Sequence, residues 1–322
     1  MRATTEAMSR TWREMRRERL AGRRPPLLVS RPVTAIVVLH YERIPLTAEC
    51  CKTLVAQKEK ARIIVVDNGS PSHGEAELRA ALPPEVEVVR LPGNRGFGGG
   101  MNAGMRRALE DPATDSVLFL NNDTRCPPEM VGAMRAALAA DPATGLVGCD
   151  MEGAGGGESA SAGYRIGRVF GYPRPCQPGE TPDYLQGSCL LLPRDVLEAT
   201  GGFDEDYRFF FEDADLSLRV RKLGWRLAIA PGVRIFHYGS ATIGAHDGRK
   251  AAWFRAGHRL FLRKWRSFPR LRALPPFLAA LAWHLARGRF ALAAGSWRGY
   301  FEPLPKSDSK NASNCSAISA QE

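Results

Sequence analysis

The sequence predicts an α/β fold in which helices flank a sheet, and two observations carry this prediction. Short apolar runs of strand length recur between residues 33 and 148. Segments with Ala, Leu, Met and Glu at helical spacing separate these runs. Apolar runs that alternate with amphipathic helices are typical of a parallel sheet whose faces are covered by helices.

The amino-terminal half is expected to contain four βα units. Each apolar run is predicted to be a strand, and these strands are expected at 33–39, 62–66, 86–89 and 116–120. Helices are expected at 47–57, 74–82 and 99–109, and after Pro127 and Pro128, since proline suits a first helical turn.

The second half of the chain departs from this repeat. Its glycine-rich stretch, residues 152–163, is expected to form a surface loop. Beyond it, strands are expected at 184–192 and 225–230, and helices at 194–199 and 213–223. No internal repeat is visible in the sequence.

Length and composition indicate a globular protein. With 322 residues, of which 44% are hydrophobic, the chain can bury the core of one large or two modest domains. The seven cysteines show no Cys-x-x-Cys spacing, which suggests neither a disulfide framework nor a zinc site and fits a reducing compartment. The first 24 residues are basic but lack the apolar run of a secretory signal peptide, so a cytoplasmic protein is expected.

The formal net charge of +11 is unevenly distributed. Residues 1–24 hold eight Arg and three Glu, and residues 249–300 hold twelve Lys or Arg without any Asp or Glu. A basic flank that carries aromatic residues indicates a nucleic-acid arm or a surface for anionic lipid, and plain solvated charge is the alternative. The expected organisation is a disordered basic segment at 1–30, a folded domain at 31–248, a basic helical extension at 249–300 and a disordered tail at 301–322.

Within the extension, residues 251–297 are predicted to form two basic amphipathic helices, the second at 274–286. The apolar run of the second helix is shorter than the roughly 20 residues that cross a bilayer, and it contains His284. We therefore expect these helices to lie on a membrane surface and not to span the membrane.

Two predicted strands end in carboxylates, at the sheet edge where ligands bind in open α/β folds. In residues 65–70 (VVDNGS), Asp67 follows an apolar strand where a nucleotide base or ribose would bind, although a plain turn explains the same residues equally well. In residues 118–124 (LFLNNDT), Asp123 can bind Mg²⁺ or Mn²⁺, which take one or two carboxylates and complete their shell with diphosphate and water. The alternative there is a helix cap.

A third motif, residues 93–104 (GNRGFGGGMNAG), holds six glycines in twelve residues. Glycine lets the backbone approach a ligand closely, and free amides at a helix start attract phosphate or polar sugar groups. The spacing matches neither the phosphate loop of nucleotide triphosphatases nor the dinucleotide fingerprint. A flexible linker is the alternative, but Asn94, Arg95 and Asn102 are more polar than a linker requires.

Two further motifs carry acids and a histidine. Residues 202–216 (GFDEDYRFFFEDADL) interleave acids with aromatics, and burial beside the phenylalanines would raise a carboxylate pKa and make a better general base. Glu212 and Asp213 could instead serve only the dipole of the helix that they open. His237, in residues 235–240 (IFHYGS), follows an apolar strand and could bind metal, whereas a structural role is the commoner one for a lone histidine.

In this order, the motifs resemble those of the family 2 inverting glycosyltransferases, which have the GT-A fold, and in particular the rhamnosyltransferase-like branch of that family. The likeness runs from about residue 33 to about residue 243. It implies a GT-A domain at 31–248 with a mixed sheet. It also implies that a sugar, rhamnose from a thymidine diphosphate donor, moves to a hydroxyl of a glycan or lipid-linked acceptor with the help of Mg²⁺ or Mn²⁺.

The resemblance also implies roles for single residues. Asp213, helped by Glu212, would be the general base, and Asp123 with His237 would bind the metal. The donor would be contacted by Asp67 at its nucleobase and by Asn68, Asn94, Arg95, Gly96, Phe97, Gly98, Asn102 and Asn122. The metal motif is Asn-Asn-Asp where the family pattern is Asp-x-Asp, so metal affinity is expected to depend largely on bound donor.

Two other classes of protein are the alternatives. A nucleic-acid-binding protein would bind with an affinity that falls steeply with salt, but the polar motifs lie in the acidic central part of the chain, and we expect no nucleic-acid partner. A nucleotidyltransferase would release pyrophosphate, and a non-catalytic sugar-nucleotide-binding protein would release no product. The expected partners are a nucleotide sugar, a glycan or lipid-linked acceptor and the inner face of the cell membrane.

Overall fold

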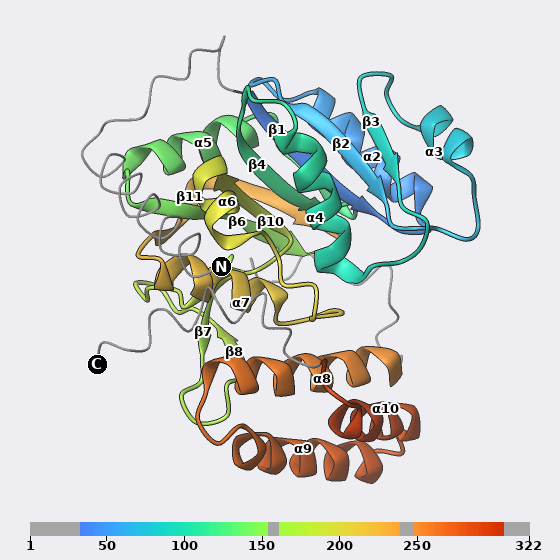
Figure 1. The fold of residues 1–322 in the computed structure, drawn as a ribbon, viewed down its shortest axis with the longest axis vertical. Coiled ribbons are helices and arrows are strands. Elements are labelled where there is room, and N and C mark those ends of the chain that lie inside the picture. Colours follow the sequence, from blue (N-terminus) through green and yellow to red (C-terminus); the bar gives the residue numbers. More distant parts are fainter. Residues whose placement is uncertain (1–32, 154–160, 239–247, 306–322) are drawn as a thin grey trace, which may run out of the picture. The chain divides into compact units, whose positions relative to one another are not determined.

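The computed structural model describes residues 33–153, 161–238 and 248–305 (Figure 1). The chain divides into two compact units, residues 1–245 and 246–322. Within the described residues, the first unit holds an eight-stranded sheet and a three-stranded sheet, and the second unit holds helices. The expected segment at 1–30, most of the expected glycine-rich loop and most of the expected tail lie outside the described residues.

The large sheet is mixed, with the strand order β3-β2-β1-β4-β10-β6-β11-β5. Its strands are β1 (Val33–His40), β2 (Arg62–Asp67), β3 (Glu87–Arg90), β4 (Thr114–Asn121), β5 (Thr124–Arg125), β6 (Thr144–Gly153), β10 (Cys189–Pro193) and β11 (Arg226–His237). β10 is antiparallel to both of its neighbours and β5 is antiparallel to β11, whereas the other neighbouring pairs are parallel. The carboxyl ends of β1, β2 and β4 therefore meet at one edge of the sheet.

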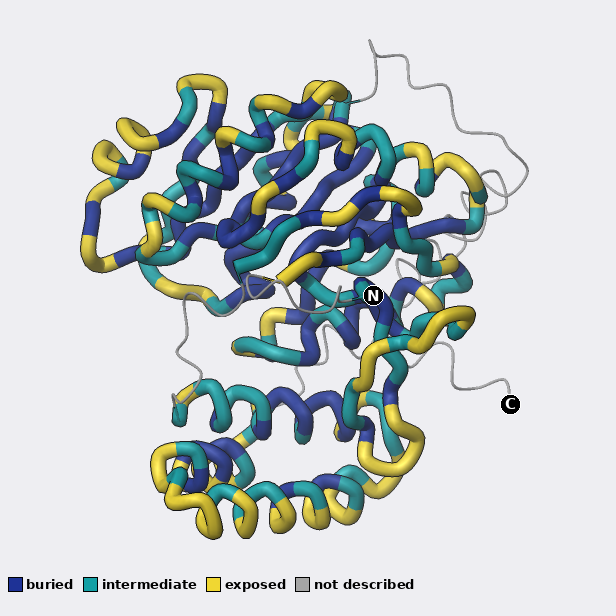
Figure 2. Tube along the Cα trace, turned by 180° about the vertical axis from the view of Figure 1, so that it is seen from behind, coloured by how far each residue is buried: buried dark blue, intermediate teal, exposed yellow. Residues whose placement is uncertain are grey.

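Helices cover both faces of this sheet because its central strands are apolar on both sides. In β1, Ile36 and Val38 belong to one core cluster, whereas Ala35 and Val37 belong to the other, and Figure 2 shows the strands as buried. The first cluster includes residues of α2 (Ile44–Val55), α3 (Glu75–Ala81) and α5 (Met130–Ala140). The second includes residues of α4 (Gly96–Leu109), α6 (Arg194–Thr200) and α7 (Glu212–Lys222). The predicted α/β fold with a mixed sheet flanked by helices is confirmed.

Strand β6 was missed by the sequence analysis because two glycines weaken its apolar pattern. A Cβ on Gly145 would lie 2.6 Å from the Cβ of Trp225, and a Cβ on Gly148 would lie 3.2 Å from the Cβ of Ala162. Both glycines are therefore required by side chains that pack closely on the strand, which sequence periodicity does not reveal.

The predicted strand at 184–192 is wrong as a single element. It is divided into β9 (Tyr184–Leu185), which joins β7 (Gly163–Ile166) and β8 (Pro173–Pro175) in the small sheet, and β10 in the large one. The predicted strand at 225–230 is too short, since β11 continues to His237 across a register shift between Ile229 and Arg234. Proline and glycine at the shift obscure this continuity in the sequence.

The second unit contains three described helices, α8 (Gly248–Trp265), α9 (Pro269–Ala286) and α10 (Phe290–Phe301). The prediction of two helices is wrong, because the helical backbone is interrupted twice. Phe268, with a φ of 54°, lies between α8 and α9, and Gly288, with a φ of 66°, lies between α9 and α10. The expected tail also starts too early, since α10 includes residue 301. None of the helices in the described residues is long and apolar enough to cross a membrane.

Small residues let α8 and α10 pack with their backbones in close approach. A Cβ on Gly295 would lie 1.9 Å from the carbonyl oxygen of Gly248, and a Cβ on Gly299 would lie 2.0 Å from that of Ala252. We expect Gly299→Ala to lower the free energy of unfolding of this unit by about 1–3 kcal/mol, since backbone must move to admit the methyl group. Thermal unfolding followed by circular dichroism measures the change.

Ala294→Val is the matched control, because residue 294 is exposed on the same helix. It is expected to change the free energy of unfolding by no more than about 0.5 kcal/mol. Equal stability of the two variants would contradict the close packing of α8 against α10.

Candidate active site

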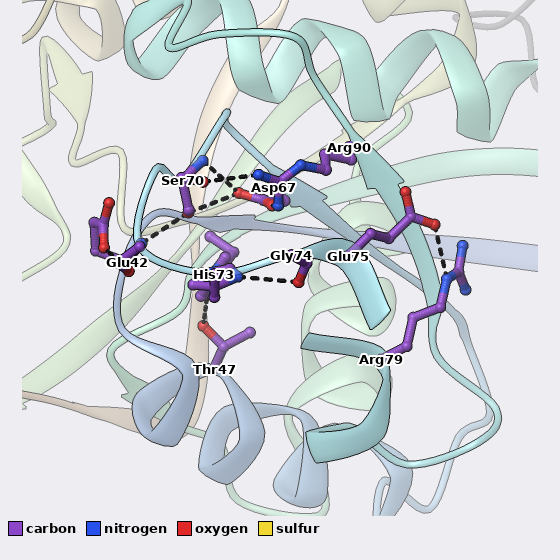
Figure 3. Close-up of polar contacts among 11 residues, drawn as sticks. Glu42, Thr47, Asp67, Ser70, His73, Gly74, Glu75, Arg79 and Arg90 are labelled. Carbon is purple, nitrogen blue, oxygen red and sulfur yellow. Dashed lines mark hydrogen bonds and ion pairs between the residues drawn. The ribbon is translucent and has the colours of Figure 1, made fainter. Parts of the chain in front are cut away.

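A tightly bonded carboxylate ends strand β2. Asp67 is buried, and its Oδ1 accepts hydrogen bonds from the backbone amide and the hydroxyl of Ser70, at 3.0 and 2.7 Å. Arg90, at the end of β3, donates to its Oδ2 at 2.5 Å (Figure 3). Both carboxylate oxygens are thus engaged within the protein. A direct contact between Asp67 and a nucleobase stays a prediction.

Asn68 connects the turn after β2 to the glycine-rich motif. Its side-chain amide donates to the carbonyl of Gly96 at 3.0 Å, and its side-chain oxygen accepts from the backbone amide of Arg95 at 2.9 Å. The oxygen of Asn94 accepts from the amide of Gly96 at 2.9 Å. These bonds hold the start of α4, which begins at Gly96 and thus three residues before the predicted start. The motif is therefore the first part of a helix and not a flexible linker.

The acidic and aromatic segment after α6 contacts this helix. Gly96 has a φ of 73°, and a Cβ there would lie 2.8 Å from the carbonyl oxygen of Arg208. Asn102 donates to the carbonyl of Phe203 and accepts from its amide, each at 2.8 Å, and Arg95 pairs with Glu205 at 2.7 Å. Because Asn102 is buried and bonded to Phe203, the structure gives it a supporting position, and its predicted contact with the donor stays untested.

The pairing of β11 with β5 brings the two predicted metal ligands together. His237 lies opposite Thr124, the residue after Asp123, and its Nε2 lies 3.1 Å from Asp123 Oδ1. The backbone amide of Tyr238 donates to the carbonyl of Asp123 at 2.9 Å. One divalent cation can take a carboxylate oxygen and an imidazole nitrogen at this separation and leave positions for diphosphate and water, so these residues fit the predicted metal. The neighbouring Asn122 donates to the hydroxyl of Thr47 at 2.8 Å.

The predicted base is linked to the same strand end as the predicted metal ligands. Asp213 Oδ2 accepts from the backbone amide of Gly187 at 2.9 Å. The carbonyl of the next residue, Ser188, accepts a hydrogen bond from the backbone amide of Asn121 at 3.0 Å. Asn121 ends β4 and precedes Asp123 by two residues. Gly187 is thus bonded to Asp213, and the adjacent Ser188 is bonded to the strand that leads to Asp123.

The carboxyl groups of Glu212 and Asp213 differ in their expected charge. Burial raises the pKa of Asp213 to about 6, and hydrogen bonds from the backbone amides of Gly187 and Ala214 oppose the rise. Burial and the neighbouring charge of Asp213 raise the pKa of Glu212 well above its ordinary value, and Glu212 Oε2 has no hydrogen-bond partner among the residues that the structure describes. Glu212 is therefore the protonated member of the pair, and Asp213 is the one that ionises near neutral pH, as a general base should.

Two features of this region escaped sequence analysis. Phe210 and Phe211, which directly precede α7, both have a φ of 70°, an uncommon angle for bulky residues that marks a strained entry into the helix. Tyr164 and Tyr184 of the small sheet stack with ring centroids 5.3 Å apart. Burial first, and then the charge of Asp213, raise the pKa values of both tyrosines, so their hydroxyls stay protonated close to the predicted base. No spacing in the sequence signals either feature.

Comparison with known sequences points to sugar transfer. The family model described as glycosyl transferase family 2 matches residues 35–201, and the model described as glycosyl transferase family 21 matches residues 181–297. The N-acetylglucosaminyl-diphospho-decaprenol L-rhamnosyltransferase of Mycobacterium tuberculosis is 26% identical over 275 residues, which cover 72% of this chain and 89% of that protein. The low-salt glycan biosynthesis hexosyltransferase Agl10 of Haloferax volcanii is 26% identical over 197 residues, or 58% of this chain and 61% of its own.

Solved structures of glycosyltransferases share the fold. The crystal structure of GalNAc-T7 with UDP, GalNAc and Mn²⁺ matches with a TM-score of 0.59 and 12% identity, over 75% of this chain and 49% of that chain. The mannosyltransferase PcManGT from Pyrobaculum calidifontis, in complex with GDP-Man and Mn²⁺, matches with a TM-score of 0.54 and 19% identity, over 98% and 96% of the two chains. These likenesses confirm the predicted GT-A fold.

Proposed function

The chain belongs to glycosyl transferase family 2, in its rhamnosyltransferase-like branch, and we propose that it is an inverting, metal-dependent enzyme that moves rhamnose from a thymidine diphosphate donor. The proposed acceptor is a hydroxyl of a glycan or of a lipid-linked sugar. The rhamnosyltransferase relative supports both choices, since its name specifies a decaprenol-linked acceptor and L-rhamnose.

One observation carries this proposal: the carboxylate suited to proton transfer and the carboxylate suited to metal binding are separate but neighbouring. Asp213 is bonded to Gly187, and Ser188 is bonded to the end of the strand that leads to Asp123. In a single displacement, one acid must take the proton of the incoming hydroxyl while charge builds on the departing diphosphate. Two acids with these different surroundings meet both demands.

We assign the proton transfer to Asp213. The acceptor hydroxyl loses its proton to this carboxylate as its oxygen attacks the anomeric carbon of the donor, and the bond from that carbon to the diphosphate oxygen breaks on the opposite side. Asp123 and His237 would hold the divalent cation, which when bound neutralises the departing diphosphate so that no general acid is needed. Protonated Glu212 adds no second negative charge beside Asp213, so Asp213 can ionise near neutral pH and act as the base.

The donor is proposed to bind along the start of α4 and the turn after β2. Asn68 and Asn94 fix the backbone there, and Arg95 extends toward Glu205. Amides at a helix start suit the diphosphate or the sugar hydroxyls. The full set proposed to line the donor, including the residues whose contacts support the site, is Asp67, Asn68, Asn94, Arg95, Gly96, Phe97, Gly98, Asn102 and Asn122.

A panel of nucleotide sugars tests the function. Thermal shift of the purified chain, with and without Mn²⁺, is expected to identify a thymidine diphosphate sugar as the stabilising ligand. With an acceptor present, a glycosyltransferase releases free nucleoside diphosphate. Release of pyrophosphate would favour a nucleotidyltransferase, and stabilisation without any release would favour a sugar-nucleotide-binding protein.

The activity should depend on pH through Asp213. Because burial raises its pKa to about 6, we expect kcat/KM to fall about tenfold for each pH unit below that value and to level off above it. Measuring initial rates between about pH 5 and pH 8 with saturating metal checks the profile. A rate that stays constant down to about pH 5 would rule out Asp213 as the base.

We also propose that the helices of the second unit bring the enzyme to an anionic membrane surface. On α9, Leu271, Leu274, Leu278 and Leu285 are exposed, and spacings of three, four and seven residues place them on one face of the helix. Residues 249–300 add twelve Lys or Arg, each worth about 1 kcal/mol near an anionic surface. An exposed apolar stripe among basic residues is typical of a helix that lies in a membrane interface.

Replacing Leu271 and Leu278 together by Glu should abolish co-flotation with phosphatidylglycerol liposomes, since it removes two apolar anchors and adds two negative charges. The charge-matched control replaces Ala279 and Ala286, which are exposed on another face of α9, by Glu. This control should weaken flotation only through its charge. Equal flotation of the two variants would contradict an apolar contact with lipid.

A further inference from the structure

A cluster of two histidines and one aspartate lies at the carboxyl ends of β1 and β2. His40, Asp67 and His73 are buried, and one potential ligand atom from each lies within 4.8 Å of the others. His40 ends β1. Asp67 ends β2, and His73 lies two residues before the first residue of α3 (Figure 3). The two histidines have no part in the proposed transfer reaction.

Hydrogen bonds to the outer ring nitrogens orient both imidazoles. His73 Nδ1 lies 3.2 Å from the carbonyl oxygen of Gly74, which can only accept, so Nδ1 carries the proton and Nε2 of the neutral ring presents a lone pair. That lone pair faces Nε2 of His40 at 2.9 Å. The other nitrogen of His40, Nδ1, lies 2.6 Å from the hydroxyl of Thr47.

The hydroxyl of Thr47 allows two proton arrangements with the same heavy-atom positions. When it donates to His40 Nδ1, the proton on His40 Nε2 bonds to His73. When it donates to the carbonyl of Arg43, 3.3 Å away, it accepts the proton of His40 Nδ1, and the lone pairs of both Nε2 atoms converge beside Asp67. Only a cation stabilises the second arrangement. Metal-bound histidines have this pattern, with the outer nitrogen donating to a fixed acceptor.

We propose that His40, Asp67 and His73 bind a divalent transition-metal ion of the Zn²⁺ class, at a site separate from Asp123 and His237. Two imidazoles and a carboxylate suit Zn²⁺, and solvent completes the tetrahedron. Two nitrogens on one tetrahedral Zn²⁺ are about 3.3 Å apart. The present separation of 2.9 Å therefore needs only a small widening. Cysteine spacing, which suggested no zinc site, does not bear on a site without cysteines.

The surroundings of the cluster include one factor that favours metal binding and one that opposes it. Burial lowers the pKa of His40 to about 4, so a proton does not compete for its lone pair near neutral pH. Arg90 opposes metal binding, because its guanidinium already neutralises Asp67 at 2.5 Å. The site is therefore one of limited affinity, and Arg90→Gln is expected to tighten it.

Titration with Co²⁺ tests the site directly. The untagged full chain is stripped of metal with chelator and titrated while visible absorption is recorded, since tetrahedral Co²⁺ absorbs strongly and thiolate ligands add separate near-ultraviolet bands. One equivalent is expected to bind without thiolate bands and to be displaced by Zn²⁺. His40→Gln and His73→Gln should each weaken Co²⁺ binding by about 100-fold or more, and Arg90→Gln should tighten it by about tenfold.

Two controls separate this site from other metal binding. Asp123→Asn should retain the Co²⁺ signal, and His284→Gln in the second unit should leave it unchanged. Nitrogen NMR of the histidines in the wild-type protein provides a test that needs no variant. Zn²⁺ should move the His40 proton from Nε2 to Nδ1 and leave the His73 proton in place. Absence of the tetrahedral Co²⁺ signal, its persistence in His40→Gln and His73→Gln, or an unchanged His40 tautomer would each overturn the proposal.

Discussion

Replacing Asp213 by Asn is expected to lower kcat by about 10²–10⁴-fold while leaving the affinity for the nucleotide sugar within about threefold of wild type. Asparagine keeps the shape of the side chain and can still accept the hydrogen bond that Gly187 donates at 2.9 Å. It cannot take a proton from the acceptor hydroxyl. Initial rates with saturating donor and calorimetric donor binding measure the two effects separately.

Glu212→Gln is the matched comparison for that variant. Because burial and the Asp213 charge keep Glu212 protonated, an amide replaces it with little change in charge or shape, and kcat should fall by less than about tenfold. If Glu212→Gln lost as much activity as Asp213→Asn, the result would contradict the assignment of the proton transfer to Asp213.

Asp123→Ala is expected to weaken donor binding in the presence of Mn²⁺ by about 100-fold or more, and to leave the weaker metal-free binding of the nucleotide nearly unchanged. Asp123 is the single acid of the Asn-Asn-Asp motif, so its loss removes the principal charge that holds the cation. Calorimetric titration with nucleotide, with and without Mn²⁺, gives both affinities.

His237→Gln should act in the same direction with a smaller effect, about 10-fold to 100-fold. The imidazole lies 3.1 Å from Asp123 and would supply a second ligand without charge. Metal-dependent donor binding that survives in Asp123→Ala would mean that the cation is held elsewhere.

The regular part of the fold could be predicted from the sequence because its strands are buried on both faces. Strands β1, β2, β3 and β4 and helices α2, α3 and α4 begin and end within three residues of their expected positions. Strand β6 could not be predicted in the same way, since Gly145 is placed by the side chain of Trp225, 80 residues further along the chain. The small sheet depends on similar long-range pairing.

The candidate site was predictable where single strands end and unpredictable where segments meet. Asp67 and Asp123 follow apolar runs, and the structure places Asp67 at the end of β2 and Asp123 two residues beyond the end of β4 in the same sheet. The packing around Gly96 could not be predicted, because a Cβ there would meet the backbone of Arg208, a neighbour that local sequence does not reveal. The stacked tyrosines beside Asp213 likewise depend on the pairing of β7 with β9.

The stereochemistry of the product tests the central claim most directly. With one carboxylate taking the proton and another holding the cation, no protein group forms a bond to the sugar, and in the proposed single displacement the acceptor oxygen arrives opposite the departing diphosphate. Proton NMR of the reaction with the donor that the panel identifies should show an anomeric configuration opposite to that of the donor. A product that retains the configuration of the donor would contradict the assignment of Asp213 and Asp123 to these separate tasks.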